Sequence, residues 1–195
     1  MDILKEELKD ALCRTDLEYL FYNRYRFDIN ERFVDEDNDS LLLYSLSDSG
    51  SKSYFFLLEE GADISLVNDY GEGCYHAVVY ADDVERMEML FRYPASHKFM
   101  NLQAYDGTTP LLLSIFLEHY ESFIWLINKG VDMTLATGDK VFPAHAVCMI
   151  EDQRFFTVLF NAGVDFAVVT DKGLTPADLA KKNNFGELVS MLEKI

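Results

Sequence analysis

Apolar side chains recur along the chain in short blocks that predict pairs of short helices rather than strands. The stretch 110–119 predicts one helix, and the stretch 122–128 predicts the next. Pro110 stands in the first turn of the first helix, where its missing N–H removes no intrahelical hydrogen bond. Thr109 precedes it and is a favourable N-cap. The pattern then turns extended for a few residues before a new helix pair begins.

The helix pairs recur with a fixed period. The prolines of the first helices show a 33-residue spacing, at Pro110, Pro143 and Pro176. A Gly-x-Asp phrase follows the second helices, where a left-handed residue is needed, at Gly61, Gly130 and Gly163. The interval from Gly61 to Gly130 is two periods plus three positions, so it contains one further repeat with a short insertion. Cys74 takes the proline position of that repeat, and segment 91–98 replaces its Gly-x-Asp turn.

These phrases resemble the ankyrin repeat family, which has a 33-residue period and a Thr-Pro-Leu-His-x-Ala signature. The closest matches are Thr109-Pro-Leu111, Pro143-Ala-His-Ala146 and Thr175-Pro-Ala177. The resemblance implies an all-α solenoid of about six helix-turn-helix repeats with short hairpin loops. Stacked repeats should share one core, formed by apolar positions of the second helices: Leu57, Leu58, Leu90, Trp125, Leu126, Ile127, Leu159, Phe160 and Leu192.

The resemblance also divides the chain. We expect a degenerate N-terminal capping repeat over residues 1–34, in which segment 11–20 looks like a helix-turn-helix step. An ankyrin repeat array should follow over residues 35–195, with repeats at about 35–68, 69–103, 104–136, 137–169 and 170–195. In the first of these repeats, Ser40-Leu-Leu-Leu43 occupies the place of Thr-Pro-Leu-His.

Composition narrows the function classes. The chain has 195 residues, of which 49% are apolar, so it can bury a core and is not globally disordered. Its 34 acidic and 17 basic residues give a net charge of −17, which disfavours nucleic acids and anionic membranes as partners. Three widely spaced cysteines and no signal-like start predict reduced thiols and a cytoplasmic location.

The ionisable residues give little sign of chemistry. In the family, the signature histidine makes a structural hydrogen bond between turns, which is the role expected for His76 and His145. Cys148 lies three residues after His145 and could suggest a nucleophile with its base, but Cys148 occupies a small core position of the repeat. The remaining histidines lack the spacing of metal ligands. We therefore expect no enzyme activity, no metal and no cofactor.

The inner face is the first candidate binding surface. In the ankyrin arrangement, residues after the signature histidine and near the end of the first helix point into the concave surface. Aromatic and aliphatic side chains occupy many of these positions, with acidic residues at their edge, which often marks a protein interface. The alternatives are that the N-terminal segment or a curled array covers this stripe, or that the register is shifted by one. The residues are Tyr44, Tyr80, Leu113, Phe116, Leu117, Met149 and Ile150, edged by Asp82, Glu118 and Glu151.

The hairpin tips are the family's other contact surface. Asp106, Asp139 and Asp171 lie at these tips, although aspartate is also a common turn-former. Tyr70 and Tyr105 are not required by any turn and are therefore the better binding candidates, because tyrosine is frequent at interface hot spots.

Two functions remain open at this stage. The first is an acidic cytosolic immunity or inhibitor protein that binds and masks a basic protein such as a bacterial toxin, since negative charge speeds association with a cationic partner. The second is an ankyrin adaptor or a secreted bacterial effector that docks on a host protein. The absence of an attached domain or secretion tail favours the first. In either case, we expect a monomer in the absence of the partner.

Overall fold

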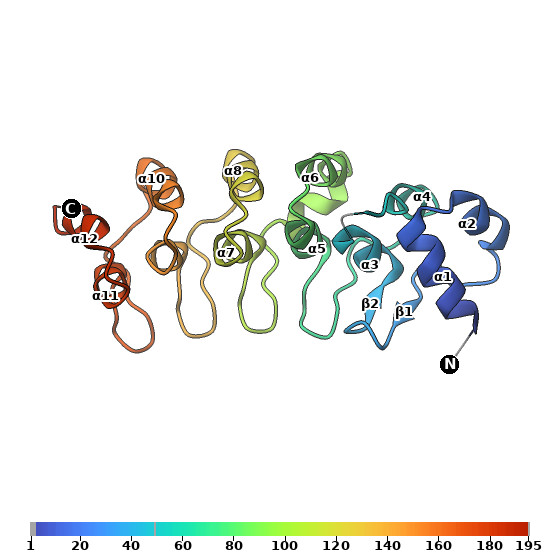
Figure 1. Ribbon diagram of the computed structural model, residues 1–195, viewed down its shortest axis with the longest axis horizontal. Helices are drawn as coiled ribbons and strands as arrows, with labels where there is room; N and C mark the ends of the chain where they lie inside the picture. Colours follow the sequence, from blue (N-terminus) through green and yellow to red (C-terminus); the bar gives the residue numbers. More distant parts are fainter. Residues whose placement is uncertain (1–2, 49, 195) are drawn as a thin grey trace. The chain divides into compact units, whose positions relative to one another are not determined.

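The structure, a computed structural model, describes residues 3–48 and 50–194, and its regular elements are almost all helical (Figure 1). The prediction of an all-α chain is therefore confirmed. The outer ends of the first and last expected repeats, residues 1–2 and 195, lie outside the described range. The helices are α1 (Ile3–Arg14), α2 (Leu17–Asn23), α3 (Leu41–Ser47), α4 (Tyr54–Glu59), α5 (Cys74–Ala81), α6 (Val84–Phe91), the 3₁₀ helix η1 (Pro94–Phe99), α7 (Pro110–Phe116), α8 (Tyr120–Asn128), α9 (Pro143–Ala146), α10 (Gln153–Asn161), α11 (Pro176–Lys182) and α12 (Gly186–Leu192).

A small strand pair interrupts this pattern in the N-terminal half. Strand β1 (Arg32–Phe33) runs antiparallel to β2 (Asp39–Ser40), with Arg32 opposite Ser40. Each strand has only two residues, so the pair forms the base of a hairpin rather than a sheet. Across residues 3–48 and 50–194, no helix is both long and apolar enough to cross a membrane.

The chain forms two compact units, Met1–Leu102 and Gln103–Ile195. In the first unit, α3 packs against α1, α4 and α5, and α6 packs against α5 and η1. In the second unit, α9 packs against α7, α10 and α11, while each first helix contacts the second helix of its own pair. Figure 1 shows the pairs α7–α8, α9–α10 and α11–α12 side by side, with the hairpins between them on one side.

The helix caps lie at the residues that the sequence pattern predicts, but two helix bounds differ, because α7 ends at Phe116 rather than at residue 119 and α8 begins at Tyr120 rather than at residue 122. The Thr109 hydroxyl accepts a hydrogen bond from the Leu112 N–H, and Thr175 makes the equivalent bond to Asp178. Ser40 caps α3 in the same way. The glycines after the second helices have left-handed backbones that favour glycine, with φ of 88° at Gly61 and 77° at Gly130 and Gly163.

Successive hairpins within each unit are joined by one recurring backbone hydrogen bond. In the first unit, Asp69 donates its N–H to the carbonyl of Asp37 in the preceding hairpin at 2.9 Å. In the second unit, Gly138 donates to Asp106 at 2.7 Å and Asp171 donates to Asp139 at 3.0 Å, with the same spacing in sequence. Gly107 lies at one of these close approaches, where a Cβ would lie 2.8 Å from the Gly138 nitrogen.

Most of the expected core positions are buried. Leu57, Leu58, Leu90, Trp125, Leu126 and Leu159 are all at most 7% exposed. Ile127 and Leu192 are half-buried. Phe160 contradicts its prediction, because its side chain is 44% exposed. Its ring stacks on Phe156 with 5.8 Å between centroids and lies 6.4 Å from the ring of Phe166, so it packs beside the core while almost half of the side chain stays exposed.

Two segments depart from the regular repeat pattern, the N-terminal segment and the short insertion. The N-terminal segment forms α1 and α2, which are separated by Thr15 in a left-handed conformation, and Asp16 caps α2 by accepting a hydrogen bond from Tyr19. The short insertion falls at η1. There the Ser96 hydroxyl lies 3.1 Å from the Tyr75 hydroxyl and donates to the Leu90 carbonyl, so the insertion packs back onto α6.

Candidate functional site

An apolar surface lies in the second unit, where the first helices of two neighbouring pairs end. Phe116 and Leu117 at the end of α7 are each 38% exposed, and Met149, which follows Phe116 by one repeat period, is 46% exposed. Ile150 is half-buried. Since α7 contacts α9 and these residues occupy equivalent positions, we call Phe116, Leu117, Met149 and Ile150 the α7–α9 patch.

The backbone at the end of α7 explains why these side chains stay exposed. Glu118 adopts a left-handed conformation, with φ of 57°, and donates its N–H to the Ile115 carbonyl at 3.0 Å. His119 then donates to the Ser114 carbonyl, and the chain reverses into α8. This tight reversal leaves the side chains of 116–118 outside the packed helix pair. Glu118 and its equivalent Glu151 are exposed, so the patch has carboxylates beside it.

Two residues expected on this surface are placed differently. Leu113 is only 7% exposed, so its side chain belongs to the interior of the second unit rather than to the patch. Tyr44 is half-buried in the first unit, edge-on to Phe33 at 5.0 Å and with its hydroxyl 3.5 Å from the Cys13 sulfur on α1. Burial raises the pKa of Tyr44 above its usual range. At this position the N-terminal segment covers the expected face, as one of the alternatives foresaw.

The first unit exposes a tyrosine and an aspartate at the end of α5. Tyr80 is 45% exposed, and its hydroxyl donates to the Glu72 carboxylate at 2.8 Å. Asp82 is exposed and ends α5 in a left-handed conformation with φ of 48°. In sequence these two residues precede Phe116 and Glu118 by one repeat, the repeat that carries the insertion. Each unit therefore exposes an aromatic side chain next to an acidic one at the same repeat position.

The hairpin tips carry two exposed tyrosines and an aspartate that stabilises its own turn. Tyr105 is 76% exposed and Tyr70 is 57% exposed. The Tyr70 hydroxyl donates to the Asp37 carboxylate at 3.3 Å, and the charge of this carboxylate raises the pKa of Tyr70. The Asp106 carboxylate instead accepts two hydrogen bonds from Thr108, at 2.8 and 2.9 Å, and so shapes its own turn.

Asp139 and Asp171 are exposed at the next two tips, where their backbones are joined by the recurring hairpin bond. Their exposed carboxylates could contact a partner, while their backbone groups hold the two hairpins together. Of the tip residues, the tyrosines are therefore the clearer candidates for contact.

The signature histidines have structural roles. His145 Nδ1 accepts a hydrogen bond from the Phe142 N–H at 3.2 Å, and Nε2 lies 3.0 Å from the Leu174 carbonyl in the next hairpin. Burial lowers the pKa of His145, which keeps the ring neutral. His76 Nδ1 likewise accepts from the Gly73 N–H. The contact of His145 with the next hairpin confirms the role predicted for that histidine, whereas the bond from Gly73 to His76 caps the start of α5 within its own repeat.

The buried thiols lack the environment of a nucleophile. Cys148 is fully buried, and burial raises the pKa of its thiol to about 12, so no thiolate is present near neutral pH. Both ring nitrogens of His145 already have backbone partners, so this histidine is not oriented as a base for Cys148. Within the described ranges, no group of three or more His, Cys, Asp or Glu side chains is arranged to hold a metal ion.

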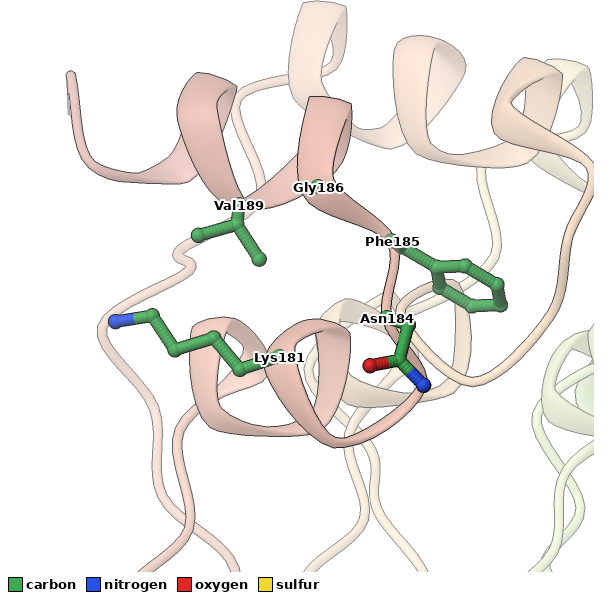
Figure 2. Close-up of a pocket in the computed structure, with 5 residues that line it drawn as sticks. All are labelled: Lys181, Asn184, Phe185, Gly186 and Val189. Atoms are coloured by element: carbon green, nitrogen blue, oxygen red, sulfur yellow. The ribbon is translucent and has the colours of Figure 1, made fainter.

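A shallow depression lies between α11 and α12 at the end of the second unit (Figure 2). Lys181 from α11 and Val189 from α12 flank it, while Asn184, Phe185 and Gly186 form the connecting turn. Lys181 is the only ionisable residue in this lining, so the depression contains no acid–base pair. It offers no basis for a catalytic site.

Sequence reasoning missed one exposed surface, at α2 and the turn that follows it. Leu17, Phe21, Tyr22 and Tyr25 are 47%, 49%, 73% and 86% exposed. A signal was present in the sequence, because residues 19–27 contain five aromatic residues, two arginines and no acidic residue. Such a composition is unusual in a chain with a net charge of −17.

Comparison with known proteins gives one weak relationship. No protein-family model matches the chain. A segment of 83 residues, or 42% of the chain, is 26% identical to the Nuclear factor NF-kappa-B p100 subunit of Xenopus laevis. The matched segment covers 9% of that protein, so the chain spans less than a tenth of its relative's length.

Proposed function

We propose that this chain is an ankyrin repeat solenoid that acts by binding another protein and performs no catalysis. The 33-residue spacing of the prolines and the hairpin hydrogen bonds that recur once per repeat support the repeat assignment. The weak similarity to a protein that contains ankyrin repeats points in the same direction. Repeat arrays of this type present extended surfaces to their partners, which favours a binding role.

The α7–α9 patch is the observation that carries this proposal. Phe116, Leu117 and Met149 remain 38–46% exposed, and Ile150 is half-buried, although the helices that precede them are well packed. Protein interfaces commonly combine an apolar centre with a polar or charged rim. Glu118 and Glu151 supply such a rim, and Tyr105 is a further exposed side chain of the same unit. Tyr70 and Tyr80 are exposed candidates for partner contact in the first unit, because tyrosine offers contact area and a hydroxyl together.

The charge of the chain favours a basic partner. A net charge of −17 accelerates encounters with cationic proteins and disfavours anionic ones. We therefore propose an acidic immunity or inhibitor protein that masks a basic protein, such as a bacterial toxin, within the cytoplasm. The buried, unpaired thiols of Cys74 and Cys148 are compatible with such a reducing compartment.

Affinity capture with matched variants tests this function. The tagged wild-type chain, the variant Phe116→Ala/Met149→Ala and the control Phe160→Ala/Met191→Ala would each be incubated with lysate of the source cells. The control removes the same two residue types from α10 and α12, where they are 44% and 36% exposed. Captured proteins would be identified by mass spectrometry, purified and titrated by calorimetry.

We expect a basic protein that binds the wild type and the control but is lost with the α7–α9 variant. Thermal melting followed by circular dichroism would establish that all three chains are folded. An acidic partner whose capture depends on the α7–α9 patch, or equal binding of the basic partner by the α7–α9 variant, would contradict the proposal. Neighbouring genes provide a second test, since a toxin gene beside this one is expected for an immunity protein.

A further inference from the structure

The surface around α2 has a different chemistry from the rest of the chain. Most of its side chains are aromatic, aliphatic or basic, although Glu18 on the same helix is exposed and acidic. We call the following set, in which Arg24 is half-buried and the other side chains are exposed, the α2 patch: Leu17, Phe21, Tyr22, Arg24, Tyr25 and Arg26. All six belong to the first unit, and none belongs to the surface proposed above. Interface centres are enriched in tyrosine, phenylalanine and arginine and depleted in lysine and acidic residues, which matches this composition.

Arg24 is held in place on the aromatic side chains of the patch. Its guanidinium carbon lies 4.1 Å from the ring centre of Phe21 and 4.3 Å from that of Tyr25. One nitrogen donates to the Phe21 carbonyl at 2.5 Å, and the other terminal nitrogen donates to the Tyr25 hydroxyl at 3.0 Å. A guanidinium has five N–H donors, so some remain for a ligand. The side chain is thus already ordered before binding.

The positive charge of the patch is not neutralised locally. Arg26 donates to the Asn23 amide oxygen at 2.8 Å, and across the described residues neither Arg24 nor Arg26 pairs with a carboxylate. Arg154 provides a contrast, because it also stacks on an aromatic ring, that of Tyr120 at 4.1 Å, but is bound to Asp152 at 2.6 Å. Two ordered, uncompensated arginines beside exposed aromatic rings form a site complementary to carboxylates.

We propose that the α2 patch binds a short acidic segment of another protein, with carboxylates on Arg24 and Arg26 and an apolar side chain against Tyr22 and Tyr25. The size of the patch favours a short segment. Exposed Glu18 lies within the stretch 17–26 and exposed Asp16 and Asp28 flank it in sequence, so a long polyanion would extend over like charges. The same argument disfavours nucleic acid and an anionic membrane. In a symmetric dimer, the patches of two copies would bring like-charged arginines together.

Calorimetric titration with defined peptides tests this site in the full chain. The probe is acetyl-Glu-Glu-Phe-Glu-Glu-amide, and the comparison peptide replaces every Glu by Gln. The variants are Arg24→Gln/Arg26→Gln and, because loss of Arg24 contacts could disturb α2, Tyr22→Ser as an independent second change. Arg154→Gln is the matched control, since it removes a stacked arginine that is already paired.

The acidic peptide should bind the wild type and Arg154→Gln with equal affinity and should bind the double variant at least tenfold more weakly. Tyr22→Ser should weaken binding several-fold, and the Gln peptide should bind at least tenfold more weakly than the Glu peptide. Binding that is unchanged in the patch variants would overturn the proposal. So would patch-dependent dimerisation in sedimentation, or patch-dependent binding of oligothymidine or phosphatidylserine vesicles without peptide binding. Since the α7–α9 patch is untouched, failure here leaves the proposed function unaffected.

Discussion

Arg86 on α6 donates a 2.6 Å hydrogen bond to the backbone carbonyl of Asp48, which lies 38 residues earlier in the chain. The same guanidinium also donates to the carbonyls of Leu46 and Ser51, each at 2.8 Å, and to that of Ser45 at 3.3 Å. Its charge is balanced by Asp83 at 2.9 Å. The side chain is 2% exposed, so this arginine supplies buried donors to carbonyls in the last turn of α3 and in the segment between α3 and α4.

Replacing Arg86 by Met should lower the free energy of unfolding by about 3–5 kcal/mol, because it leaves buried carbonyls without a donor and removes the ion pair of the Asp83 carboxylate. Arg86→Lys should cause an intermediate loss, since an ammonium group keeps the charge but lacks the planar set of five donors. Urea denaturation would measure both. Arg92→Met is the control, because Arg92 is exposed at the end of the same helix and should change stability by no more than about 0.5 kcal/mol.

Comparable losses for Arg86→Met and Arg92→Met would show that the buried arginine is dispensable. A loss for Arg86→Lys equal to that for Arg86→Met would show that the planar set of donors stabilises the fold and that a positive charge alone does not.

The parts of the fold that could be predicted from the sequence depend on local interactions. Thr109 caps α7 through a residue three positions away, and Gly130 ends α8 through its own backbone conformation, so both are visible in a short window. Arg86 could not be predicted in this way. The carbonyls that it binds lie 35–41 residues away, and the local pair with Asp83 does not distinguish it from an exposed arginine.

The predicted binding surface likewise could be predicted only where exposure depends on local structure. Phe116 and Met149 are exposed as expected, because they lie where first helices end. Leu113 lies one helical turn earlier and is buried, since an offset of a few residues changes which neighbour a helical side chain meets. The cover over Tyr44 depends on where α1 packs, which periodicity does not specify. The binding role of all these residues remains a prediction.

Phe116→Ala and Tyr80→Ala should each weaken binding of the captured basic partner by about 2–4 kcal/mol if they are hot spots. The physical reason is the loss of a large side chain that is exposed in the free chain and buried in the complex. Calorimetry would measure the dissociation constants, and Met191→Ala serves as a control at an exposed apolar position on α12. Variants that melt early while binding per folded molecule stays normal would indicate a structural role instead.

Reversing the charges at the rim should act mainly on the association rate. Glu118→Lys/Glu151→Lys should slow association with a basic partner and reduce its dependence on salt, while dissociation changes less. Lysine is tolerated in the left-handed backbone of position 118, because Lys140 already adopts φ of 57°, the same value as Glu118. Stopped-flow measurements over a range of salt concentrations would test this. A change confined to the dissociation rate would contradict steering by these carboxylates.

Asp39 on β2 carries a buried carboxylate oxygen, Oδ1, that finds no hydrogen-bond partner within the described chain. Desolvation raises the pKa of Asp39 from 3.8 to about 6, although a hydrogen bond from Asn68 opposes this, and the negative charges of Glu72, Asp37 and Glu36 raise it further. The folded chain therefore holds this proton more tightly than the unfolded chain does. Between about pH 4 and pH 6 the native state binds more protons, so the contribution of Asp39 to stability is lost as the pH rises.

Asp39→Asn should consequently stabilise the chain at pH 7.5, where the aspartate is ionised and the asparagine carries no charge. A pKa raised from 3.8 to about 6 corresponds to about 3 kcal/mol, and solvent screening of this half-buried group reduces the expected gain to about 1–2 kcal/mol. The gain should disappear near pH 4, where Asp39 is protonated in the native state. Urea denaturation at both pH values would measure it, with Glu59→Gln as the control because Glu59 is an exposed residue of the same unit. An equal gain at both pH values would mean that packing, and not ionisation of Asp39, is responsible.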